Sequence, residues 1–457
     1  MDLFTPVVSV DLQHQNFRRL TSEGREPERD VLRRWATDFP DRDGKFVKEF
    51  QTTFNSCFWE LYLHATFRAS GLTLDFTKAA PDFSVDSGAT AFTAEAAIAS
   101  HAAGFAAEWE VDPAEELSPE RKRAVLDYAS IRLANAFDGK LRKFRTSYSR
   151  FDHVAGKPFV VCLAPFEQPY SYLLAERGLR RLLYAFDLPV FVDDDVTGKR
   201  VIVGSSTPER VWKSSTADVP FGLFTDARAS EVSAVIYSSV ATFGKVQALS
   251  ESTRPAVFTA VRYNATGTQP FLIHAPRDHY EEGLLDGLHV FLNPYAAIAF
   301  DPSIFDPREV AIHHGFDDEL GIVRTSMPHG FLFSRTVMTF GPTDPAKHGP
   351  SPAGSRGKLA ELEPWPEGEL RPIGGSFTAY SKIHLAHYAG WTILVAHDRF
   401  DDEWGAQATR GVYKDLFAYM QGSKGDPDSF MAPGFFASRD EAFSAMKNEI
   451  DELPKKA

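Results

Sequence analysis

Cysteine and long apolar runs are both scarce in this sequence. Cys57 and Cys162 are the only cysteines among 457 residues. This argues against a disulfide framework and a cysteine-rich zinc site, and favours a reducing cytoplasm. No run of 18 or more apolar residues occurs, so we expect no membrane-spanning helix. The first twenty residues lack a basic segment followed by a long apolar run, so no signal peptide is expected.

Several catalytic motifs are also missing. The sequence has no G-x-x-x-x-G-K-[ST], G-x-S-x-G or G-x-G-x-x-G in a usable context, so nucleotide hydrolysis, serine hydrolysis and dinucleotide binding have no support. The formal net charge of −13 counts mildly against nucleic-acid binding. These absences leave a large protein with ample apolar residues and no common cofactor motif.

One segment departs from the acidic average. Residues 121–157 contain ten Lys or Arg against three Asp, a local charge of +7. One interpretation is a solvated helix face. The other is a surface that faces the phosphates of a nucleic acid.

The length predicts more than one unit. Residues 341–372 contain seven prolines and five glycines, a composition typical of a linker. We therefore predict an N-terminal extension over 1–45, a main domain over 46–340 and a small C-terminal α/β domain over 373–457. In the C-terminal domain we expect a strand at 391–398, a helix at 404–421 and a final helix at 438–453.

The main domain begins with a definite order of elements. Apolar residues recur at intervals of three and four over 45–70, which predicts a helix that Gly71 ends. The remaining elements that we expect are strands at 72–76, 81–85 and 89–99, a basic helix at 128–150, a buried strand at 157–166 and a helix at 171–186. The order α-β-β-β-α-β predicts a mixed sheet flanked by helices, with a core over 46–190.

Two carboxylates interrupt the hairpin of this sheet. Asp82 follows a proline and Glu95 lies among alanines. A turn at 86–89 would pair residue 82 with residue 93, which puts both acids on one face with their Cα atoms about 7–8 Å apart. Such a pair suits Mg²⁺, or Mn²⁺ as a substitute. The alternative is an exposed hairpin with Glu95 in solvent.

This arrangement resembles the PD-(D/E)XK nuclease superfamily, which has the restriction-endonuclease-like fold. The residues that carry the resemblance are Glu60 in the first helix, the Pro81-Asp82 pair and Glu95 in the next strand, followed by the basic helix and the buried strand. The resemblance implies that Asp82 and Glu95 hold Mg²⁺ and that Glu60 completes the site. It also implies a catalytic lysine two residues after the second acid.

The sequence departs from the family at that lysine. Ala97 occupies the position, so the expected E-x-K is E-A-A. Some members supply the lysine from the following helix, where Lys140 and Lys143 are available, and we favour Lys140 because it lies nearer the middle of the helix. The predicted site is therefore Glu60, Asp82, Glu95 and Lys140.

The resemblance implies cleavage of phosphodiester bonds. We expect Arg132, Arg142, Lys143 and Arg145 to contact nucleic acid, with DNA the expected substrate rather than RNA. The expected protein is cytoplasmic and has no membrane partner, and a homodimer is compatible with these features. The rival hypothesis is a degenerate member that binds without cutting. His313 and His314 offer metal-type ligands, but we expect them to lie in a polar surface loop.

Overall fold

A computed structural model describes most of the chain. The residues outside the description are 87, 89–90, 103–107, 109, 111–117, 169, 188, 194–199, 206–209, 214–217, 268–269, 318–319, 321, 340–367, 369, 373–379, 399–402, 411–429, 433–434 and 454–457. The expected linker at 341–372 thus lies almost entirely outside the described residues.

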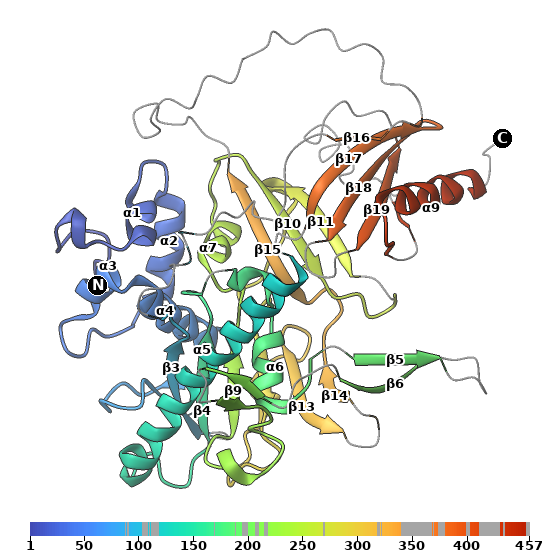
Figure 1. Ribbon diagram of the computed structural model, residues 1–457. Helices are drawn as coiled ribbons and strands as arrows, with labels where there is room; N and C mark the ends of the chain where they lie inside the picture. Colours follow the sequence, from blue (N-terminus) through green and yellow to red (C-terminus); the bar gives the residue numbers. More distant parts are fainter. Residues whose placement is uncertain are drawn as a thin grey trace.

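The centre of the molecule is a mixed sheet of eight strands (Figure 1). Its spatial order is β1 (Thr73–Leu74), β2 (Phe83–Asp86), β3 (Ala91–Ile98), β4 (Phe159–Ala164), β9 (Ala234–Tyr237), β12 (His289–Leu292), β13 (Ala311–Asp317) and β14 (Ile322–Ser326). Strands β3, β4 and β9 run parallel to one another, and β2 pairs with β3 as an antiparallel hairpin. The expected mixed sheet is therefore present.

Helices cover both faces of this sheet (Figure 1). Strand β4 shows why, since all six of its residues are buried and its side chains alternate between two cores. Val160 and Cys162 pack into the core of α4 (Phe54–Ala69), whereas Val161 and Leu163 pack into the core of α5 (Pro119–Thr146) and α6 (Arg177–Tyr184). A strand buried on both sides has no solvated face, which explains its continuous apolar run.

Two predicted helices are shorter than expected. The helix predicted over 45–70 is divided into α3 (Phe46–Thr52) and α4, because Thr53 has non-helical dihedrals of φ −121° and ψ 48°. Threonine is β-branched and has a low helix propensity, which is consistent with a break at this residue. The helix predicted over 171–186 is a 3-10 turn at Ser171–Leu173 followed by α6, since Ala175 takes a left-handed φ of 44° between them.

The hairpin register differs by two residues from the prediction. Val85 lies opposite Phe92, and Phe83 lies opposite Ala94, so the strands continue toward Asp82 at the level of Glu95. All four of these apolar side chains are buried. Burial of apolar pairs therefore sets the register, and a shift of two residues keeps every side chain on its predicted face.

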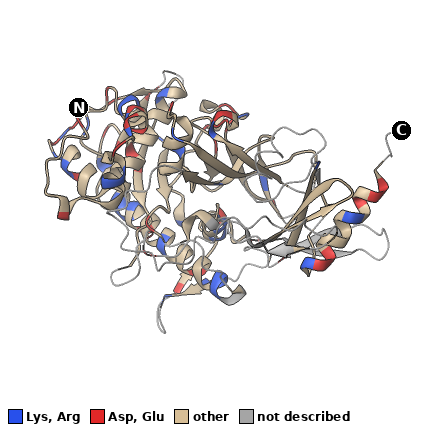
Figure 2. Ribbon diagram, turned by 90° about the horizontal axis from the view of Figure 1, so that it is seen from above, with Lys and Arg blue, Asp and Glu red and all other residues tan. Residues whose placement is uncertain are grey.

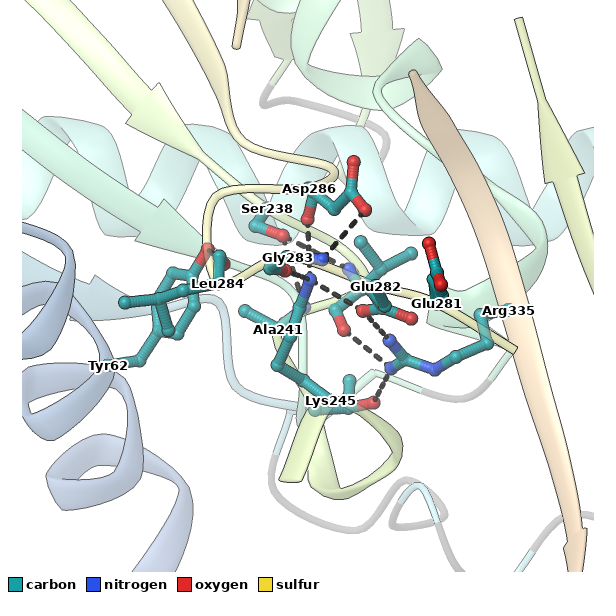
Figure 3. Close-up of polar contacts among 12 residues, drawn as sticks. Tyr62, Ser238, Ala241, Lys245, Glu281, Glu282, Gly283, Leu284, Asp286 and Arg335 are labelled. Atoms are coloured by element: carbon teal, nitrogen blue, oxygen red, sulfur yellow. Dashed lines mark hydrogen bonds and ion pairs between the residues drawn. The ribbon is translucent and has the colours of Figure 1, made fainter. Parts of the chain in front are cut away.

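A three-stranded sheet packs beside the large one. It consists of β11 (Phe271–Pro276), β10 (Ala256–Arg262) and β15 (Leu332–Thr339), with α7 (Phe243–Leu249) next to β15. A buried charge cluster joins these elements (Figure 3). Lys245 Nζ lies 2.5 Å from Glu282 Oε1, and Arg335 forms a second ion pair with the same oxygen. All three side chains are at most 1% exposed.

The C-terminal residues form a separate sheet with its own core. Its order is β16 (Arg371–Pro372), β17 (Tyr380–Tyr388), β18 (Trp391–Asp398), β19 (Trp404–Arg410) and β20 (Phe430–Met431), and α9 (Arg439–Glu452) packs against it. The strand at 391–398 and the final helix are as predicted, with Ser438 as the N-cap. The helix predicted over 404–421 is wrong for residues 404–410, which are strand β19 and pair along their whole length with the apolar β18. The rest of that prediction, 411–421, lies outside the described residues.

Among the described residues, no helix has the length and apolar content needed to cross a membrane. Cys57 and Cys162 are both buried free thiols. Acidic and basic residues alternate along the N-terminal helices and along α9 rather than separating by sign (Figure 2).

Candidate acidic site

A cavity of about 510 Å³ lies where the hairpin meets α4 and α5. All four predicted site residues line it. Lys143 lines it too, as does Ala97, which stands where the family has its lysine. The full lining is Ser56, Trp59, Glu60, Asp82, Glu95, Ala96, Ala97, Ile98, Asn135, Ala136, Gly139, Lys140 and Lys143. The fold therefore collects in one cavity acids and amines that lie up to 83 residues apart in the chain.

Glu95 is the centre of the polar contacts. Its side chain is 1% exposed, and its Oε1 accepts hydrogen bonds from Lys140 Nζ at 2.8 Å, Lys143 Nζ at 2.9 Å and the Tyr148 hydroxyl at 3.0 Å. Burial alone would raise the pKa of Glu95, but the charges and hydrogen bonds of the two lysines outweigh it and lower the pKa. The carboxylate is therefore held ionised although it is buried.

Asp82 interlocks with Glu95 through the backbone. The Asp82 amide donates to Glu95 Oε2 at 3.2 Å, and the Ala96 amide donates to Asp82 Oδ2 at 2.8 Å. Burial and the negative charge of Glu95 raise the pKa of Asp82. The prediction of two acids on one side of the hairpin thus matches the geometry, and the exposed-hairpin alternative for Glu95 is wrong.

Glu60 enters the same cavity from α4. Burial, followed by the negative charge of Asp82, raises the pKa of Glu60 to about 8. The negative charge of such a carboxylate is poorly balanced. Both lysines are bonded to Glu95, while Glu60 and Asp82 repel each other. An added cation in this cavity would relieve the repulsion between the two acids.

Both candidates for the displaced lysine, Lys140 and Lys143, reach the site. Lys140 and Lys143 lie one helical turn apart on α5 and both reach the same oxygen of Glu95. Their exposure differs, since the Lys140 side chain is 23% exposed and that of Lys143 is 52% exposed. Lys140 is therefore the more enclosed amine, while Lys143 supplies a second positive charge at the cavity mouth.

The donor set fits Mg²⁺ only in part. Within the described part of the chain, no group of three or more His, Cys, Asp or Glu side chains forms a ready-made metal site. Mg²⁺ needs fewer protein ligands than that, because it retains several waters and is commonly held by one or two carboxylates plus substrate phosphates. Asp82 and Glu95 would hold it, and Glu60 lines the space beside them.

The comparisons add nothing to this geometry. No protein-family model, curated protein or solved structure matches this chain.

The four basic residues expected to contact nucleic acid differ in the contacts that they make within the protein. Arg145 is paired with Glu231 and also donates to the carbonyl of Arg228, while Arg132 donates to the carbonyl of Ser100. Lys143 is bound to Glu95. Arg142 is exposed, and among the described residues its guanidinium has no hydrogen-bond or ion-pair partner. Of the four, Arg142 is the one that no such contact holds, although its charge also acts on the carboxyl of Asp138.

Sequence reasoning missed Tyr148. The residue follows α5 in a short 3-10 turn, and its hydroxyl donates to Glu95 from a buried position. Burial, together with the charge of Glu95, raises the pKa of Tyr148. No spacing in the sequence signals this contact, because it depends on how the chain turns after the helix.

The expected loop at His313 and His314 is wrong. Both histidines lie in β13 and point to opposite sides of the strand. His313 is buried, its Nε2 lies 3.1 Å from His289 Nδ1, and its Nδ1 lies 2.9 Å from the hydroxyl of Thr325. Burial lowers the pKa of His313, so it is a neutral core residue here.

Proposed function

We propose that this protein is a divergent restriction-endonuclease-like nuclease that hydrolyses phosphodiester bonds of nucleic acid with Mg²⁺. The observation that carries the proposal is the meeting of Glu60, Asp82 and Glu95 with two lysine amines in one cavity. Element order α-β-β-β-α-β and the position of Asp82 beside Glu95 support it. DNA is the proposed substrate rather than RNA, and a cytoplasmic location is part of the proposal.

In this proposal the acidic residues would bind the metal ion and the lysines would contact the phosphate. A bound Mg²⁺ would supply the Lewis acid that activates water and neutralises charge on the phosphate. Asp82 and Glu95 would hold the ion, and the amines of Lys140 and Lys143 would stabilise negative charge that develops at the phosphate oxygens. Glu60, whose pKa is raised to about 8, would hold a proton at its carboxylate at neutral pH until a metal ion binds.

The direct test is cleavage. Purified protein is incubated with plasmid DNA, single-stranded DNA and RNA, in the presence of Mg²⁺, Mn²⁺ or EDTA. We expect cleavage with either metal, none with EDTA, and a loss of about a hundredfold or more in Glu95→Gln, because the buried carboxylate that binds metal and lysine becomes neutral. Glu23→Gln, at an exposed residue far from the cavity in sequence, should cut like wild type. Metal-independent cleavage, or full activity in Glu95→Gln, would contradict the proposal.

A second test concerns phosphate contacts. Each contact to duplex DNA contributes about 0.9 to the slope of log affinity against log salt. We expect Arg142→Glu to flatten that slope by about one contact and to weaken all sequences alike. Arg145→Glu is the matched control and should change the slope less, because Glu231 already neutralises Arg145. Gel shifts over a salt series would measure this. Equal effects of the two variants would contradict the assignment.

The rival is a non-catalytic binding or scaffold module of the same fold. The observation that favours it is that both lysines are bonded directly to Glu95, while Ala97 occupies the usual lysine position. This rival predicts binding of nucleic acid that EDTA does not abolish and no cleavage with any metal. The cleavage assay separates the two.

A further inference from the structure

A second cavity, of about 390 Å³, lies on the other side of α4. Ser56 and Glu60 line the acidic cavity, whereas Asn55 and Phe58 of the same helix line this one. Its walls come from parts of the chain that are distant in sequence: α1 (Gln15–Thr21), α4, Glu108, the segment after β4, α7 and β15. A volume of this size is within the range of small-ligand pockets.

Aromatic rings form much of the wall. The rings that line the cavity are those of Phe54, Phe58, Phe166, Tyr170, Tyr172 and Phe243. Phe58 and Phe166 meet edge to face, with their centroids 6.3 Å apart. On the α1 side, the guanidinium of Arg19 lies 4.6 Å from the ring centre of Phe243. Rings of this kind favour a flat ligand that stacks.

The decisive feature is a buried amide without a partner. Gln168 lines the cavity and is 1% exposed, yet neither its amide oxygen nor its amide nitrogen has a hydrogen-bond partner among the described residues. Gln247 Nε2 and Arg335 Nε, which also belong to lining residues, are likewise buried and unpaired within that part of the chain. Native proteins rarely leave such groups unpaired, because each one loses its bonds to water on folding.

Contacts within the protein hold the Arg335 guanidinium in place. Its guanidinium is tied to Glu282 and donates to the carbonyl of Val240 at 2.7 Å, so only part of its hydrogen-bonding capacity is used (Figure 3). Glu108 also lines the cavity. Its Oε1 accepts from Asn55 Nδ2 at 2.8 Å, while Oε2 is unpaired among the residues described. Each of these unpaired atoms is buried behind the cavity wall, so a ligand pairs with one of them only after that side chain turns toward the cavity.

We propose that this cavity binds an adenine-type nucleobase, with the Gln168 amide pairing with the edge of the base and the aromatic side chains stacking on its faces. A glutamine amide offers one donor and one acceptor side by side, which match N7 and the N6 amino group of adenine. The inference goes beyond the proposed cleavage and stands independently of it. The base has two sources, a free nucleoside or nucleotide and an unstacked base of a strand.

The test is binding by isothermal titration calorimetry. Adenosine, guanosine, cytidine and uridine, and short single-stranded oligonucleotides with and without adenine, are titrated in EDTA so that no cleavage occurs. We expect adenine-containing ligands to bind tightest. Binding of adenosine identifies a free ligand, whereas adenine-dependent binding of oligonucleotides alone identifies a strand.

Substitutions at Gln168 make the test specific. Gln168→Leu should weaken adenine binding about tenfold to a hundredfold, which is the effect of losing one bidentate pair. Gln168→Glu should also weaken it, because a carboxylate cannot donate to N7. Two results would contradict the proposal. One is a Gln168→Leu variant that binds adenine as tightly as wild type, and the other is a wild type that binds none of these ligands at millimolar concentration.

Two controls keep the result separate from folding and cleavage. Gln168→Leu should melt no lower than wild type, since it replaces an unpaired buried amide by an apolar side chain of similar size. Glu95→Gln, in the other cavity, should bind adenine like wild type. If Glu95→Gln and wild type both fail to cut but bind adenine, the nuclease proposal fails and the adenine site stands. If wild type cuts but binds no base, the reverse holds.

Discussion

Replacing both Lys140 and Lys143 by methionine should lower the rate of cleavage by about a thousandfold, whereas either single replacement should lower it only about tenfold. Both amines donate to the same Glu95 oxygen, at 2.8 Å and 2.9 Å, so each one compensates in part for the loss of the other. Groups that act as a unit give strongly non-additive effects. The measurement is single-turnover cleavage of a labelled duplex by the four proteins.

A rescue keeps this expectation separate from folding. The double variant leaves Glu95 buried with no cation beside it, so its thermal stability must be measured in parallel. Ala97 lines the same cavity, and Ala97→Lys in the double variant should restore part of the activity by returning an amine to the family position. Normal cleavage by the double variant would overturn the displaced-lysine hypothesis. A complete loss in Lys140→Met alone would assign the role to Lys140 and leave Lys143 structural.

The largest effect on stability is expected at Glu282. Glu282→Gln should lower the free energy of unfolding by about 3–5 kcal/mol, because it leaves Lys245 and Arg335 charged, buried and without a counter-ion. The Tyr280 hydroxyl, which donates to Glu282 Oε2 at 2.6 Å, would also lose an ionised acceptor. Urea denaturation at neutral pH measures the change.

The matched controls use the same chemistry in other surroundings. Asp226→Asn removes one partner of an exposed ion pair with Arg228 and should leave stability close to wild type. Lys245→Met added to Glu282→Gln should recover part of the loss, since it removes one of the two uncompensated charges. A Glu282→Gln variant as stable as wild type would show that the cluster contributes little.

The pH dependence of the Glu282 contribution follows from its pKa. Burial alone would raise that pKa, but the charges of Arg335 and Lys245 outweigh burial and hold it at about 2, compared with 4.5 for an ordinary glutamate. Above pH 4.5 the carboxylate is ionised in both the folded and unfolded states, and its stabilising effect is fully present. Between about pH 4.5 and 2 the unfolded state takes up the proton first, so the stability difference between wild type and Glu282→Gln should shrink.

The sequence predicted those parts of the site that depend on local pattern. Strand alternation puts Asp82 and Glu95 on one side of a hairpin, and helix periodicity brings Lys140 and Lys143 to one side of α5. The two-residue register error did not matter for this purpose, because it preserved the faces. Local patterns of this kind are strong where a hairpin or a single crossover connects the residues.

The parts that failed depend on contacts distant in the chain. Residues 404–410 have a helix-compatible composition, yet pairing with β18 makes them a strand. Tyr148 reaches Glu95 only because the chain turns after α5, and the partners of Arg132 and Arg145 come from other segments. The second cavity draws on six separate segments, so no spacing in the sequence reveals it.

The two buried thiols have a practical consequence. Cys57 lies in α4 and Cys162 in β4, and burial raises the pKa of both. The indole of Trp59 also donates to the backbone carbonyl of Cys162, which ties the helix to the strand. A thiol reagent therefore gains access only when this layer opens. The rate of thiol labelling in the native protein would therefore measure how often the layer of α4 and β4, which lies between the two cavities, opens locally.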